Sequence, residues 1–171
     1  MDAVQSPNAE LIARFYAAFA ALDDAAMAAC YARHARFEDP VFTLEGRDAI
    51  GSMWAMLCEA TRKTGRDVWQ LEWRDVEAEG NGGRAHWEAH YRFSATGRLV
   101  HNRIDAAFRF QDGLIVEHVD RFDFWAWSRQ ALGAPGLLLG WTPMLRAKVR
   151  GQARQNLADF MAADPGPAEP V

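Results

Sequence analysis

The 171-residue chain has few cysteines, no block of basic residues and no long apolar run. Its two cysteines, Cys30 and Cys58, both fall in predicted helices and lie outside any Cys/His cluster, which argues against a disulfide framework and a metal site. With a formal net charge of −4, a phosphate-tracking nucleic-acid surface is not expected. No apolar run approaches the ~20 residues of a membrane span, and no signal peptide is evident. We therefore expect a cytoplasmic protein with neither a nucleic-acid nor a membrane partner.

What the chain does contain is typical of a folded domain. Hydrophobic residues make up 50% and charged residues 25%, and seven Trp and ten Phe are present. Large rings fill a core, but they also line pockets for flat ligands. Late in the chain, basic residues recur at roughly helical spacing, which indicates a solvated helix face: Arg146, Lys148, Arg150 and Arg154.

Three helical segments open the chain. Ser6 and Pro7 form an N-cap and first-turn pair before an apolar face of period 3.6. Asp23 and Asp24 precede a short Ala-rich helix that we expect to extend to Tyr31. Residues 37–42 read as a short extended piece, and the third helix follows Gly46.

From residue 69 onward the pattern is that of strands. Alternating segments around 69–73, 84–94, 99–110 and 114–124 are separated by Gly-containing turns. A helix over 125–133, a linker over 134–141 and an amphipathic helix over about 143–162 follow. Helices first and an antiparallel meander afterwards predict an α+β fold, in which helices cover one face of a curved sheet.

Two of these strands have an apolar side and a charged side, and the third breaks the rule. Trp87 and Phe108 mark the apolar faces of the first two. On the third, His118 and Asp120 share the face of Phe122, so we expect them inside the core. Asp39 lies two residues after Phe37, so an extended strand would place it on the core side as well. Buried carboxylates among rings have raised pKa values and can act as acids or bases near neutral pH.

Each of these residues also has a structural interpretation. Asp39 precedes a proline and could cap a backbone amide in a turn. His118 and Asp120 could be a buried pair whose hydrogen bond serves only the fold. Both interpretations stay open at this stage.

Several motifs resemble those of known families. Phe15-Tyr16-Ala17-Ala18-Phe19, Phe37-Glu38-Asp39-Pro40-Val41 and Gly46-Arg47-Asp48-Ala49-Ile50 look like the N-terminal half of ketosteroid-isomerase and SnoaL-like proteins. The segments 108–115 and 118–123 look like their C-terminal half. The resemblance covers about residues 8–133 and extends to polyketide cyclases and limonene epoxide hydrolases of the nuclear-transport-factor-2-like superfamily.

The resemblance implies a fold and an organisation. The fold is a cone-shaped curved antiparallel sheet wrapped around N-terminal helices, a cystatin-like α+β barrel, here with an extra C-terminal helix. Residues 1–133 would form the domain, 134–162 a linker and a helix packed on it, and 163–171 a disordered tail. A homodimer is also implied.

The resemblance further implies site residues. Asp39 falls on the isomerase base and Asp120 on an acid/base aspartate of the epoxide hydrolases, with His118 on a pocket-lining position. The isomerase oxyanion-hole tyrosine falls on Phe15, beside Tyr16, and its protonated aspartate on Ala106. The remaining residues expected to line the pocket are Phe19, Phe37, Trp54, Trp87, Tyr91, Phe108 and Phe122.

These observations predict a small-molecule-pocket protein that uses no cofactor and no metal. Its partner would be a small hydrophobic molecule, cyclic or unsaturated. The reaction would be acid/base chemistry of the isomerase, cyclase, dehydratase or epoxide-hydrolase type. The alternative is a non-catalytic ligand-binding or dimerising module of the same fold.

Overall fold

The computed structural model describes residues 6–163. Within them the helices are α1 (Pro7–Ala20), α2 (Asp24–Ala28), α3 (Arg47–Thr64), α4 (Phe124–Leu132), α5 (Ala134–Leu139) and α6 (Pro143–Ala163). The strands are β1 (Tyr31–Glu38), β2 (Thr43–Glu45), β3 (Gln70–Glu79), β4 (Gly82–Arg92), β5 (Leu99–Gln111) and β6 (Leu114–Arg121). Of the helices in this part of the chain, none combines the length and apolar character that a membrane span requires.

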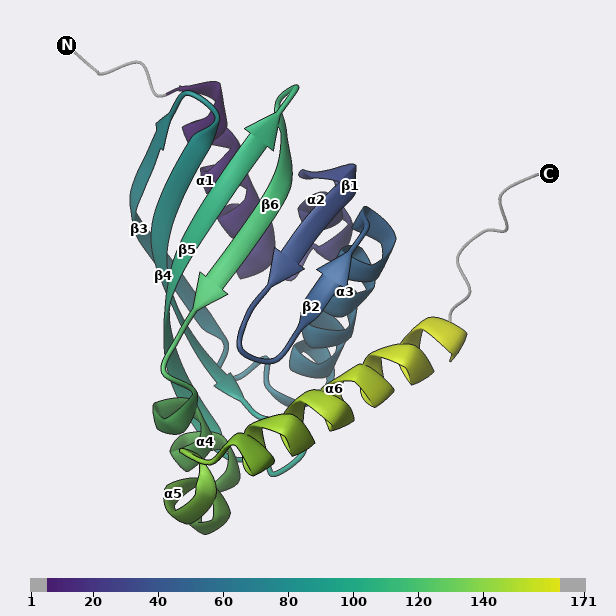
Figure 1. Cartoon of the computed structure of the whole chain (residues 1–171), viewed down its shortest axis with the longest axis vertical. Helices are drawn as coiled ribbons and strands as arrows, with labels where there is room; N and C mark the ends of the chain where they lie inside the picture. Colours follow the sequence, from purple (N-terminus) through teal and green to yellow (C-terminus); the bar gives the residue numbers. More distant parts are fainter. Residues whose placement is uncertain (1–5, 164–171) are drawn as a thin grey trace.

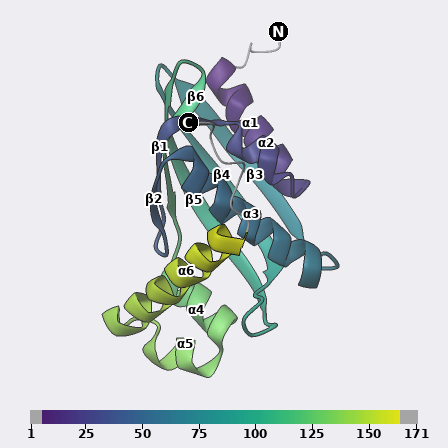
Figure 2. The ribbon, with the colours of Figure 1, turned by 90° about the vertical axis from the view of Figure 1, so that its right-hand side faces the viewer.

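The strands form one six-stranded sheet in the order β2-β1-β6-β5-β4-β3. All neighbours are antiparallel except β1 and β6, which pair in parallel. The sheet is curved and open, and α1, α2 and α3 lie on its concave face (Figures 1 and 2). The predicted α+β cone with an additional C-terminal helix is therefore confirmed.

Helix α1 shows how the sequence builds this arrangement. The Ser6 side chain accepts a hydrogen bond from the Ala9 amide, and Pro7 needs no partner in the first turn. The apolar residues then recur on the face that packs on β3, and the buried members are Ala9, Leu11, Ile12, Phe15, Tyr16 and Phe19. The helix thus fills the interior of the cone.

The inner faces of the strands follow the predicted alternation with one exception. Ala85, Trp87 and Ala89 of β4 are buried, as are the alternate residues of β5. On β6, however, Ile115 is buried and Val116 is only half-buried. The pairing of β5 with β6 shifts register between Arg109 and Phe110, and this irregularity reverses the expected sides of Ile115 and Val116.

Two further predictions were wrong locally. Tyr31 and Cys30 do not continue the second helix, because α2 ends at Ala28 and Tyr31 begins β1. The segment 134–141, expected as a linker, contains helix α5. Residues 164–171, within the tail expected to be disordered, lie outside the described residues.

Helices α4 and α5 occupy one end of the cone, and α6 begins there (Figure 1). A second apolar cluster, centred on Val100, Phe124 and Trp127, joins α4 to that end of the sheet. From there α6 crosses beside α3, and its Leu157 is buried in the main core.

Candidate functional site

The side chains of His118 and Asp120 lie inside the cone, as the strand alternation predicts. His118 is 0% and Asp120 3% exposed. Five aromatic rings surround the imidazole at centroid distances between 4.4 and 6.3 Å: Phe15, Tyr31, Phe37, Trp54 and Phe108. Such an apolar setting strengthens each hydrogen bond within it and makes an unpaired polar group costly.

A line of hydrogen bonds connects four elements through this interior. Trp54 Nε1 of α3 donates to the Tyr31 hydroxyl at 3.1 Å. The Tyr31 hydroxyl lies 2.7 Å from His118 Nδ1, and His118 Nε2 lies 2.9 Å from Asp120 Oδ1. Trp87 Nε1 of β4 also donates to Asp120 Oδ1, at 3.3 Å. Tyr31 was not among the residues predicted for the site.

The donors available along this line assign its protons. Burial raises the pKa of Tyr31 well above its ordinary value, so the phenol keeps its proton. The Tyr31 oxygen accepts from Trp54, and its single proton is then directed to His118 Nδ1. His118 therefore carries its proton on Nε2 and donates it to Asp120. Asp120 is held from two sides through Oδ1 alone.

Asp39 is anchored in a comparable way, within the turn that joins β1 to β2. Its Oδ1 accepts from the amides of Val41 at 2.7 Å and Phe42 at 2.6 Å, which is the capping role that the sequence left open. Burial raises the pKa of Asp39 to about 6, although these two amides oppose the shift. Asp39 is thus both a turn residue and a carboxyl group that titrates near neutral pH.

The parallel pairing of β1 with β6 brings the two aspartates to neighbouring strand ends. Phe37 is opposite His118 and Glu38 is opposite Val119, and Asp39 and Asp120 are the next residues along the two chains. The charge of Asp120 adds to the rise in the pKa of Asp39. In the described part of the chain, the hydrogen bonds to both carboxylates end on Oδ1, and Oδ2 of each accepts none.

Tyr16 contributes an unused donor to the same interior. Its hydroxyl is, among residues 6–163, the only buried side-chain polar atom without a hydrogen-bond partner. Burial raises the pKa of Tyr16 well above its ordinary value, and the charge of Asp120 adds to this. A buried hydroxyl without a partner costs about 1–3 kcal/mol, which makes it a candidate contact for a bound molecule.

The residues expected to line a pocket all face the core. Eight of them belong to the main buried cluster: Phe15, Tyr16, Phe19, Phe37, Trp54, Trp87, Ala106 and Phe108. Tyr91 and Phe122 are half-buried and pack against both apolar clusters. Whether they contact a ligand stays a prediction.

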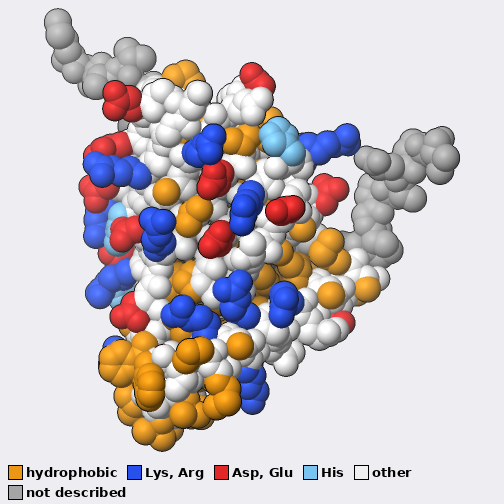
Figure 3. Space-filling model, viewed as in Figure 1, with side chains coloured by type: hydrophobic (Ala, Val, Ile, Leu, Met, Phe, Trp, Pro, Cys, Tyr) orange, Lys and Arg blue, Asp and Glu red, His pale blue; other side chains and the backbone are white. Residues whose placement is uncertain are grey.

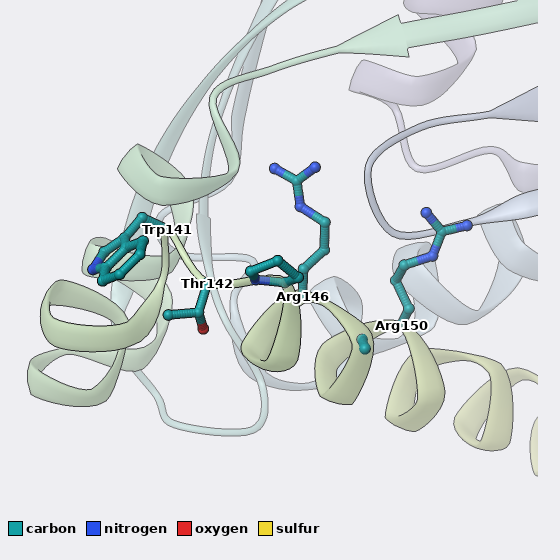
Figure 4. A pocket seen from close by; sticks show the side chains of 6 residues that line it. Trp141, Thr142, Arg146 and Arg150 are labelled. Atoms are coloured by element: carbon teal, nitrogen blue, oxygen red, sulfur yellow. The ribbon is translucent and has the colours of Figure 1, made fainter.

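Two hollows of the described surface lie elsewhere. One, of about 290 Å³, is lined by residues 141–143 and by α6 (Figure 4). The other, of about 550 Å³, is lined by the ends of β3 and β4. Neither of these two hollows is lined by Asp39, His118 or Asp120. No group of three or more His, Cys, Asp or Glu within the described residues could hold a metal ion.

The outer face of β4 and β5 carries three further histidines, His86, His90 and His101. His86 Nδ1 lies 2.7 Å from Asp105, and His101 Nε2 lies 2.6 Å from Glu88. Hydrogen bonds from Arg74, His101 and other neighbours lower the pKa of Glu88 to about 2. This charged ladder is separated from the interior by the sheet, so His86, Glu88 and His90 do not belong to the candidate site. The homodimer expected from the resemblance stays a prediction.

Solved structures share this fold. A candidate polyketide cyclase from Xanthomonas campestris pv. campestris is 21% identical, with a TM-score of 0.58 over 73% of this chain and 96% of its own. TerC, co-crystallised with polyporic acid, is 17% identical, with a TM-score of 0.60 over 74% and 99%. An LEH-like epoxide hydrolase from M. tuberculosis is 15% identical, with a TM-score of 0.60 over 82% and 96%. At these identities the likeness concerns the fold alone.

Two other comparisons address the sequence. No curated protein matches the chain. A family model described as a SnoaL-like domain matches residues 12–118, which span α1 to the middle of β6.

Proposed function

Because the chain belongs to the SnoaL-like domain family, we propose that it is an acid/base enzyme acting on a small hydrophobic molecule with a carbonyl or ether oxygen. One observation carries this proposal: two carboxylates sit at neighbouring strand ends of an apolar interior, each anchored through Oδ1. Anchoring fixes the direction of each Oδ2, and a fixed geometry is what proton transfer requires.

In the proposed reaction Asp39 is the general base. Its Oδ2 removes a proton from a substrate carbon or from a water, so that an O–H bond forms as the C–H or O–H bond breaks. A pKa of about 6 leaves it ionised at pH 7 and still basic enough for the task. Asp120 then gives or accepts the second proton, and His118 and Tyr31 hold its orientation.

We further propose that the Tyr16 hydroxyl donates a hydrogen bond to the substrate oxygen. Negative charge that develops on a carbonyl or epoxide oxygen needs a donor placed before the reaction begins. The Tyr16 hydroxyl is buried without a partner and lies within the field of Asp120. A hydrogen bond to the substrate would satisfy it.

Substitution of the two acids tests the proposal. Asp39→Asn and Asp120→Asn keep an oxygen acceptor and should preserve the fold. Each should lower kcat about 10²- to 10⁴-fold, the usual contribution of a positioned acid or base. Asp105→Asn is the matched control, because Asp105 lies on the same strand, next to the Ala106 that pairs with Asp120, but its side chain is 81% exposed on the outer face.

Deuterium uptake provides a readout that needs no known product. Cyclic enones with an acidic C–H bond would be incubated with the protein in D₂O, and a set of epoxides would be assayed for diols. The proposal requires uptake or hydrolysis by the wild type and the Asp105 control, with loss in both site variants. Equal rates in all four proteins would refute it.

The alternative is a binding module, and the position of the two hollows favours it. Neither hollow reaches the aspartates. Calorimetry with the same compounds distinguishes the two: ligands bound equally by wild type, Asp39→Asn and Asp120→Asn, without turnover, would establish binding alone.

A further inference from the structure

Helix α5 presents its large apolar side chains to solvent and its glycines to the protein. Gly136 and Gly140 are buried against α4, whereas Leu137, Leu138 and Leu139 are exposed. A Cβ at Gly136 would lie 1.9 Å from the Ser128 carbonyl oxygen. The close contact therefore requires glycine, and it fixes the leucines on the outside. This is the reverse of an ordinary amphipathic helix.

Hydrogen bonds hold this orientation. The indole Nε1 of Trp125 donates to the Leu137 carbonyl at 3.2 Å, and the Ser128 hydroxyl donates to the Gly136 carbonyl at 3.3 Å. Trp141 Nε1 donates to the Leu138 carbonyl at 3.1 Å. The exposed leucines thus belong to an ordered element and not to a loose loop.

Together with the following turn, α5 forms a protruding apolar surface. We call it the apolar tip, and define it as Leu137, Leu138, Leu139, Trp141 and Met144. Leu138 is 68%, Trp141 72% and Met144 71% exposed. Figure 3 shows hydrophobic side chains gathered at this end of the molecule, over α4 and α5. Patches of this kind mark interaction sites.

The charge around the apolar tip has one sign. Between Asp123 and Asp159 the sequence contains no acidic residue, in a chain whose net charge is −4. The same stretch contains five basic residues: Arg129, Arg146, Lys148, Arg150 and Arg154. Lys and Arg side chains border the apolar cluster in Figure 3. Arg129 lies over the Trp125 ring at 4.4 Å.

The hollow of about 290 Å³ lies between the apolar tip and this basic face. Its lining includes Trp141, Thr142, Arg146 and Arg150. In Figure 4 the side chains of Arg146 and Arg150 extend from α6 toward the same side. The Arg146 guanidinium lies over the Phe124 ring at 5.0 Å, and that of Arg150 donates to the Thr43 hydroxyl at 3.2 Å. Their remaining N–H donors suit a phosphate ester at an apolar boundary.

We propose that the apolar tip inserts into the interfacial layer of an anionic phospholipid bilayer. Leucines and a tryptophan would enter the boundary between head groups and acyl chains, and the basic residues would pair with lipid phosphates. The expectation of no membrane partner rested on the absence of a spanning run. A surface that lies in the interface needs no such run.

Charge argues against a second copy as the occupant. A symmetric contact brings each patch against its own equivalent, so two apolar tips would place Arg146 and Lys148 close to their copies. The tip also protrudes, whereas a peptide partner docks in a groove. An anionic bilayer satisfies both the shape and the sign of the charge.

Co-sedimentation with vesicles tests this. The full chain should pellet with phosphatidylcholine vesicles containing phosphatidylglycerol, and much less with phosphatidylcholine alone. Raising the salt should weaken binding, because the attraction to the surface is screened. The double variant Leu137→Ser/Leu138→Ser should lose about tenfold or more in affinity, since its apolar contact is removed. Arg146→Gln/Lys148→Gln should lose the preference for phosphatidylglycerol.

Leu57→Ser is the matched control, because Leu57 is 38% exposed on α3, outside the apolar tip. It should bind as the wild type does. Absence of binding at low salt, or equal binding by the Leu137/Leu138 variant, would overturn the proposal. A dimer of the wild type in sedimentation velocity that dissociates only in this variant would also overturn it, because a second copy would then cover the tip. Asp120→Asn should still bind vesicles, so this test is independent of the proposed reaction.

Discussion

Burial and turn geometry act on Asp39 in opposite directions. Two backbone amides stabilise its ionised form, yet the surrounding apolar residues outweigh them and raise its pKa to about 6. In the unfolded chain the same group ionises near its ordinary pKa of 3.8. The folded state therefore keeps a proton that the unfolded state has already lost, and this difference links Asp39 to stability.

We expect this linkage to lower stability as the pH rises. Between about pH 4 and pH 6 the unfolded state binds fewer protons, so the free energy of unfolding falls, by up to about 3 kcal/mol in total. Asp39→Asn keeps the two amide contacts and removes the titration. In urea unfolding experiments across this pH range, the free energy of unfolding should fall more steeply for the wild type than for the variant. Parallel curves would show that the pKa of Asp39 is not raised.

Single-residue placement was predictable where it depended on local alternation. The inward orientation of His118 and Asp120 followed from a period of two along one strand. The contribution of Tyr31 did not, because its contact with His118 joins residues 87 apart and depends on the parallel pairing of β1 with β6. Periodicity carries no information about which strands become neighbours. That the Tyr16 hydroxyl on α1 has no hydrogen-bond partner was not predictable either, because it depends on which side chains of other elements surround it.

At the scale of elements, the contact between α4 and α5 depends on a glycine. Gly136→Ala would place a methyl group 1.9 Å from the Ser128 carbonyl oxygen, so α5 must move. Overpacking of this kind costs about 1–3 kcal/mol. Gly151→Ala is the control, because it lies within α6 with nothing within 4 Å of the added methyl. It should be neutral or stabilising by about 1 kcal/mol.

Thermal unfolding of the two variants measures the difference. The Tm of Gly136→Ala should fall below that of the wild type, and that of Gly151→Ala should not. An unchanged Tm in Gly136→Ala would mean that α5 is not held by this contact. The orientation of the leucines would then need another explanation.

Elements were predictable where capping and periodicity agreed. Ser6 and Pro7 open α1, and Asp123 caps α4 through a hydrogen bond to the Ala126 amide. The segment 134–141 was taken for a linker because Gly and Pro weaken helical propensity. Its helix exists because the two glycines permit close packing on α4, which is a tertiary effect. The register shift of β6 was likewise set by its pairing with β5.

For the whole molecule, α6 packs on both apolar clusters. Ala153 and Leu157 pack on the main core, and Val149 packs on the cluster beneath α4. Leu157 is the only buried residue among the described residues of this long helix. A helix held by so few buried contacts should open at a lower free energy than the sheet does.

Leu157→Ala should therefore release α6 before the rest of the cone. Loss of a buried leucine costs about 2–5 kcal/mol, and the cost should fall mainly on the docking of this helix. Hydrogen exchange followed by mass spectrometry should show faster exchange over residues 143–163, with β4 and β5 unchanged. Met161→Ala, at a 38% exposed position of the same helix, should leave the exchange as it is. If the strands and α6 lose protection together in Leu157→Ala, then α6 is an integral part of one cooperative core, because its opening cannot be separated from global unfolding.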